Sequence, residues 1–397
     1  MELDFERIYK LSVNLLKFNR FYPFYKIDMK WIVQVLFLYS ISLLIFLALM
    51  QSSVYYIKIN ELSDVCDNGV FSLAFLGLTF MYGTVIWHKN DLIYLIESVQ
   101  KDYDESKDLS QTEINFILDY IEKGKRVVHL WAFVSIFNVF FIPSRILVVM
   151  VSEGKYNLVD VLDSFHPNIL EKSTSDIWIF FLELLIRLYY SIYANIMYVG
   201  FSPLGPIFMA HACGQLEIVM TRIKSIFTER NYDEREAKIK LIDVVQRMQR
   251  IYRFVDSINN TCELYYQITL NSTSLMLPLI VYMVIKDFQM DKVFQYITFI
   301  FGSFLMTFIP CSYSTLLLAK GDEMRESIYM SGWERHLDRD ARATIIIVLT
   351  RASRPISIHT LFKTINLDAF TDVNIDFFIN QSATIFIPDH RPLATPS

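Results

Sequence analysis

Six strongly apolar stretches follow one another along the chain, separated by polar segments. A helix rises 1.5 Å per residue, so about 20 apolar residues cross a hydrocarbon core of about 30 Å. Each stretch is close to that length or longer, and each is predicted to be a membrane span. The predicted spans lie near 31–57, 69–87, 127–151, 177–212, 264–285 and 293–319. This pattern predicts an all-α, polytopic membrane helix bundle in which residues 1–397 form a single membrane domain.

Two long connections carry apolar residues at helical spacing instead of loop-like sequence. Between 237 and 262, Ile239, Ile242, Val245 and Met248 recur every three residues, which marks one face of an amphipathic helix. The segment after the sixth span is also amphipathic. Residues 213–262 and 320–365 are therefore predicted to form a helical anchor beside the membrane.

The last segment, 366–397, does not have the length of a further span. Asp376 and Asn380 interrupt it, and Pro388, Pro392 and Pro396 give it a turn-rich end. Its longest uncharged stretch, 377–388, would extend about 18 Å as a helix, against the roughly 30 Å required. The pattern favours a short helix or a disordered tail over a complete seventh span.

The distribution of basic residues sets the orientation. The N-terminal arm and the connections after spans two and four hold twenty-one lysines and arginines, whereas the alternate connections hold five. Positive residues stay on the cytoplasmic side, so the N-terminus is predicted to be cytoplasmic. A G-protein-coupled receptor has the opposite orientation.

Composition narrows the function further. The chain is 53% hydrophobic, and its net charge of −5 is spread along its length, so no nucleic-acid-binding patch is expected. The four cysteines are far apart and the seven histidines lack the i,i+4 spacing of a helical metal site, so neither a metal nor a cofactor is expected. No intramembrane pair of carboxylates is present for acid and base catalysis, and an enzyme is not expected.

Short motifs in a fixed order carry a family resemblance. The pattern F-x-x-C-x-x-S-x-x-L spans 308–317, Y-x-S-x-W spans 329–333, R-A-x-R-P spans 351–355 and N-L-x-x-F-T-D spans 366–372. Upstream, HACGQLE occupies 211–217 and FVDSINN occupies 254–260. These motifs resemble those of the insect odorant receptors, and the resemblance covers nearly the whole chain.

That resemblance implies a seven-helix chemoreceptor of the cell membrane, expected in sensory neuron dendrites. It implies a cation channel that is gated by a small hydrophobic volatile and assembled with a shared co-receptor, as a tetramer in the lipid bilayer. The family's ligand pocket lies among spans two, three, four and six in the outer half. Aromatic residues in the outer halves of spans two, three and four are the ligand-binding candidates: Phe71, Phe75, Phe140, Phe141, Trp178, Phe181 and Tyr190.

Two further sites follow from the same resemblance. Tyr329 and Trp333 lie in the segment by which family members pack subunits together, and they are the candidate subunit anchor. A seventh, pore-lining helix would begin near Leu367 and pass through Val373, the candidate pore residue, where this chain then departs from the family pattern. A secondary transporter and a G-protein-coupled chemoreceptor are the alternatives.

Overall fold

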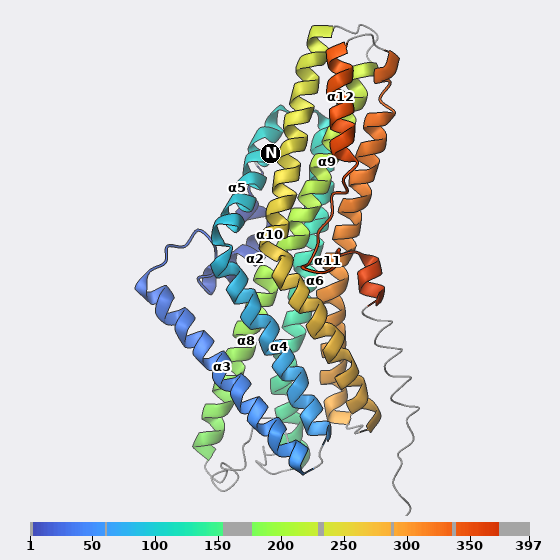
Figure 1. The fold of residues 1–397 in the computed structure, drawn as a ribbon. Helices are drawn as coiled ribbons and strands as arrows, with labels where there is room; N and C mark the ends of the chain where they lie inside the picture. The colour runs from blue at the N-terminus through green and yellow to red at the C-terminus, as the bar shows by residue number, and fades with distance from the viewer. Residues whose placement is uncertain are drawn as a thin grey trace, which may run out of the picture.

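The computed structural model describes residues 3–59, 62–153, 177–228, 234–286, 290–335 and 339–372. Within these residues the chain is helical almost throughout, as the apolar pattern predicts (Figure 1). The principal helices are α1 (Phe5–Ile8), α2 (Lys10–Phe18), α3 (Met29–Lys58), α4 (Leu62–Trp87), α5 (Lys89–Glu105), α6 (Gln111–Glu153), α8 (Ile177–Phe201), α9 (Leu204–Thr228), α10 (Glu234–Lys286), α11 (Met290–Tyr329) and α12 (Arg339–Ala352).

Five of the described helices are long and apolar enough to cross a membrane. They are Met29–Lys58, Asn68–Trp87, Ser191–Phe227, Glu234–Ile285 and Tyr296–Arg335. The predicted third span, 127–151, forms the second half of α6, where most side chains lie outside the described part of the chain. The fold is therefore an all-α membrane helix bundle.

Two of the spans continue far beyond the membrane as single helices. The α10 helix has 53 residues and joins the predicted anchor segment 237–262 to the fifth span without a break. The α11 helix has 40 residues and carries the sixth span into the charged segment after Lys320. No glycine or proline lies between 234 and 277, so the backbone hydrogen-bond ladder runs on where the sequence changes from amphipathic to apolar, and Pro278 lies further along, inside the span.

The predicted fourth span, 177–212, is divided into two helices. The α8 helix ends at Phe201 and α9 begins at Leu204. Pro203 lies at the break; a proline has no N–H to donate, and it disfavours the helical conformation of the residue before it. The helix is thus interrupted at Ser202 and Pro203. The α9 helix then runs beside α10 and α11 (Figure 1).

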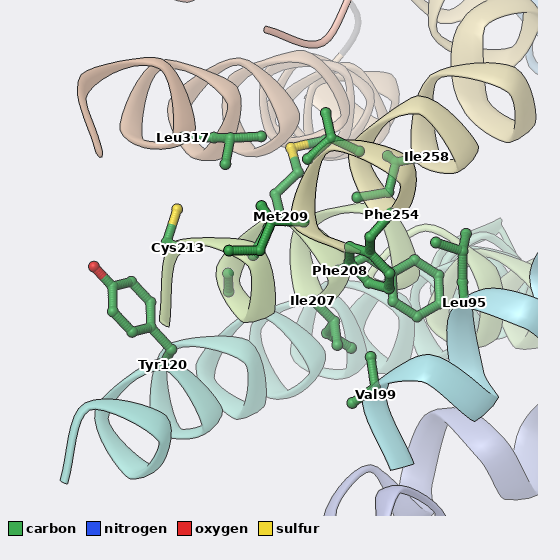
Figure 2. Packing of buried hydrophobic residues seen from close by; sticks show 14 of the residues in the cluster. Leu95, Val99, Tyr120, Ile207, Phe208, Met209, Cys213, Phe254, Ile258 and Leu317 are labelled. Atoms are coloured by element: carbon green, nitrogen blue, oxygen red, sulfur yellow. The ribbon is translucent and has the colours of Figure 1, made fainter. Parts of the chain in front are cut away.

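The core lies where four helices converge on α9. Figure 2 shows Ile207, Phe208 and Met209 of α9 surrounded by side chains of α5, α6, α10 and α11, and all three are at most 1% exposed. Burying three side chains of this size contributes about 1.5–3 kcal/mol each. By contrast, α3 leaves most of its apolar surface exposed at the edge of the bundle, which suits a helix that faces lipid (Figure 1).

The N-terminal arm packs into the same end of the bundle. Phe5 of α1 stacks on Phe208 at 6.3 Å between ring centroids, and its backbone N–H donates to the Gln100 side chain at 2.9 Å. Tyr9 lies against Gly124, where even a Cβ atom would be 2.7 Å from the Tyr9 hydroxyl. The arm therefore packs against α5, α6 and α9.

Candidate functional site

The predicted outer half of the bundle contains an aromatic contact between spans two and six. Phe71 of α4 meets Phe299 of α11 edge to face, with ring centroids 5.5 Å apart. Beside this pair, Val70, Ile280, Met283 and Tyr296 are almost completely buried and form a small apolar cluster between α4, α10 and α11. Phe71 thus lies where three spans meet and is itself half-buried.

A second group of aromatics lies deeper, between α3, α4 and α8. Phe75 is half-buried and packs against the main core. Tyr82 of α4 stacks on Tyr193 of α8 at 5.4 Å, and Tyr198 donates to the Ala74 carbonyl at 3.3 Å. The Tyr82 hydroxyl is buried and has no hydrogen-bond partner among the described residues. This group combines apolar ring surface with an unused polar atom, a chemistry that suits a small, weakly polar ligand.

The remaining ligand-binding candidates fall outside this description. Phe140 and Phe141 belong to α6, and Trp178, Phe181 and Tyr190 belong to α8, but their side chains are not among the described ones. The structure therefore places Phe71 and Phe75 one turn apart on α4, and it leaves the other five as predictions.

At the opposite end, the HACGQLE motif ties α9 to its neighbours. His211 is hydrogen-bonded to Asp102 of α5 at 2.8 Å, and Glu217 forms an ion pair with Lys320 of α11 at 2.7 Å. Gln215, two residues before Glu217, accepts a bond from Arg247 of α10 at 2.7 Å. The motif's three polar residues therefore reach three different helices. The spacing of His211 in the sequence gives no signal of this pairing.

The FVDSINN motif holds an irregular segment that follows α12. Asn259 of α10 donates to the Ser357 carbonyl at 3.1 Å and accepts from the His359 N–H at 3.0 Å. Arg351 lies over the Tyr252 ring at 4.0 Å. These contacts hold the segment against α10, and the chain then returns to α11.

The chain then begins another helix at Leu367. Residues 367–372 are helical, and Asn366 caps them by accepting from the Ala369 N–H at 2.8 Å. Phe370 packs between Phe304 and Phe308 of α11, at 5.3 and 5.5 Å. Val373, the pore candidate, lies just outside the described residues.

The two anchor candidates lie at the C-terminal end of α11 and just beyond it. Tyr329 is 62% exposed, and Met330 beside it is 69% exposed. Trp333 is half-buried against the core, and its indole N–H is buried without a partner in the described part of the chain. The half-buried indole ring lies close in the sequence to exposed apolar side chains, and a surface of this kind is suited to contact another protein.

The described residues contain no group of three or more metal-ligating side chains. The comparison with protein families gives the decisive observation: a model described as "7tm Odorant receptor" matches residues 61–374. The chain belongs to the insect odorant receptor family. This receptor is accordingly a multi-pass membrane protein and not an enzyme. The two alternatives, a secondary transporter and a G-protein-coupled receptor, are set aside.

Solved structures agree with this odorant receptor fold. The insect olfactory receptor OR5 from Machilis hrabei superimposes with a TM-score of 0.79 at 14% identity, covering 96% of this chain and 98% of that one. Its complex with eugenol gives a TM-score of 0.76 at 15% identity, covering 95% and 98%. At such identity the likeness concerns the fold alone. No curated protein matches the chain in a sequence search.

Proposed function

We propose that this odorant receptor is a subunit that binds a small hydrophobic volatile in the outer half of its bundle and gates a cation channel together with a co-receptor, as a tetramer in the cell membrane of sensory dendrites. Family membership over 61–374 carries the proposal. The similar receptor OR5 is solved with eugenol, a small volatile, which supports a ligand of that class here. A ligand shifts a closed channel toward conduction only if it binds the open state more tightly.

Phe71 and Phe75 are the described residues that support a ligand site on α4. An aromatic pair such as Phe71 and Phe299 contributes about 0.5–1.5 kcal/mol beyond its buried area, so a ligand that opens the contact must replace that energy. Phe140, Phe141, Trp178, Phe181 and Tyr190 complete the proposed lining from α6 and α8.

The test measures membrane currents from the chain expressed with a co-receptor, over a panel of volatiles. Phe75→Ala is expected to change the order of effective ligands while surface abundance stays constant. Phe133→Ala is the matched control, because Phe133 is 68% exposed on α6 and lies outside the proposed lining. An equal loss of response to every ligand in Phe75→Ala, with normal abundance, would instead assign Phe75 to packing.

The orientation is part of the proposal. The basic arm and the basic connections share one end of the bundle, which favours a cytoplasmic N-terminus. An epitope at the N-terminus should be labelled only after cells are permeabilised. Labelling of intact cells would contradict both the orientation and the family-type channel.

A further inference from the structure

A polar cavity of about 240 Å³ lies in the cytoplasmic half of the receptor, far along the bundle from the aromatic residues of the proposed odorant site. It is formed by α5, α9 and α10, the helices that the HACGQLE motif joins. Its charged or polar lining residues include Lys101, Asp102, His211, Arg247, Arg250 and Arg253. The odorant proposal makes no use of this cavity.

The charges around the cavity do not balance. Arg250 is matched by Glu105, to whose two carboxylate oxygens it donates at 3.2 and 3.0 Å. Asp102 is hydrogen-bonded to His211, with 2.8 Å between Oδ2 and Nε2. Arg247 and Arg253 have no ion-pair partner in the part of the chain that the structure describes. Two guanidinium groups thus line one cavity without a directly paired carboxylate among the described residues, although Asp102 and Asp243 lie near enough to Arg247 to stabilise its charge in part.

Arg247 is the more informative of the two. Its side chain is 6% exposed, and one of its nitrogens, Nη1, donates to Gln215 at 2.7 Å. Its Nε atom is buried and has no partner among the described residues. Burial is the largest cause that lowers the pKa of this guanidinium, and the nearby Arg222 lowers it further. A buried cation that retains an unused donor is costly unless an anion completes its surroundings.

We propose that this cavity binds a phosphate monoester, carried by a small soluble molecule or by a lipid headgroup. Guanidinium groups match phosphate oxygens by paired hydrogen bonds, and a dianion neutralises the two unmatched arginines where a carboxylate would neutralise one. The volume is below the 300–1,000 Å³ or so of pockets for drug-sized ligands, so one phosphate with a short attached group fits. A bound phosphate would link α5, α9 and α10.

The test follows thermal unfolding of the purified full chain. One arm adds glycerol 3-phosphate, with glycerol plus sodium chloride at equal ionic strength as its control. The other uses vesicles that contain phosphatidylinositol 4-phosphate, with phosphatidylinositol vesicles as control. The proposal expects the unfolding midpoint to rise with at least one phosphate probe. The arm that responds identifies the soluble or the lipid source.

Variants separate this site from general charge effects. Arg253→Gln removes an exposed cavity charge and should weaken phosphate binding about 10- to 100-fold, the loss expected for one charged hydrogen bond. Arg247→Gln should weaken it at least as much, and Arg253→Gln still tests the site if that buried variant does not fold. Arg325→Gln is the matched control, since Arg325 pairs with Asp322 on α11 outside the cavity, and it should bind like the parent. Any of three results would overturn the proposal. The midpoint could fail to shift with either phosphate probe, it could shift equally with the sodium chloride control, or Arg253→Gln and Arg325→Gln could weaken binding equally.

Discussion

Replacing Asn259 by alanine should loosen the segment between α12 and Leu367. The Asn259 side chain is 5% exposed and makes two hydrogen bonds to this segment, one to the Ser357 carbonyl and one from the His359 N–H. A net contribution of about 1 kcal/mol for each bond gives about 2 kcal/mol for the pair. Since 1.4 kcal/mol corresponds to a factor of ten, the local opening equilibrium should increase about 30-fold.

Hydrogen exchange measures this opening directly, because the His359 N–H is one of the protected groups. In Asn259→Ala, amides around 357–365 should exchange about 30-fold faster, while amides in the middle of α10 keep their rates. Asn260→Ala is the matched control: Asn260 is the next residue, is exposed, and should leave the segment unchanged. Unchanged exchange at His359 in Asn259→Ala, or equal acceleration in Asn260→Ala, would refute the clamp.

Three further predictions concern the subunit-anchor residue Trp333, the buried carboxylate Glu113 and the tail 366–397. Trp333→Ala should reduce co-purification of the co-receptor, whereas Trp87→Ala, at an exposed tryptophan where α4 ends, should not; undiminished assembly would count against an interface at Trp333. Burial raises the pKa of Glu113, but hydrogen bonds from Arg222 and Ser110 outweigh it and lower the pKa overall, so Glu113→Gln should cost about 1.5–3 kcal/mol at pH 7. This loss of unfolding free energy, measured by denaturation, should become smaller as the pH falls through about 4.3 and below, where the carboxyl of the unfolded chain is protonated. A loss that does not depend on pH would contradict the prediction. The tail 366–397 is expected not to span the membrane, so the chain alone should conduct nothing and Asn380 should carry no glycan, and a glycan there together with ligand-evoked current would show that the tail does span.

The membrane spans were predictable from sequence because hydropathy is a local property. A run such as 31–57 is long enough to cross a bilayer whatever surrounds it, and it forms part of α3. The division of the fourth span was not predicted, although Pro203 marks it in the sequence. Its neighbours remain apolar on both sides, so hydropathy alone continues through the break.

The contacts of the motif residues could not be predicted in the same way. His211 pairs with a residue 109 positions away, and Asn259 holds backbone atoms about 100 positions away. A single sequence records no such pairing, because neither partner requires a particular spacing. The cavity beside Arg247 depends on three helices meeting, and the helical pattern around 237–262 predicted one of those helices without its neighbours.

The continuous α10 helix also has a mechanical consequence. Its 53 residues make a rod about 80 Å long, which joins the apolar cluster around Ile280 and Met283 to the helices packed around α9. A rod of that length that tilts by about 3° about one end moves its other end by about 4 Å, roughly three-quarters of a helical turn. Pro278 is the position inside it where a hydrogen bond is missing and bending is easiest. A small bend at Pro278 is therefore enough to displace the distant N-terminal end of α10.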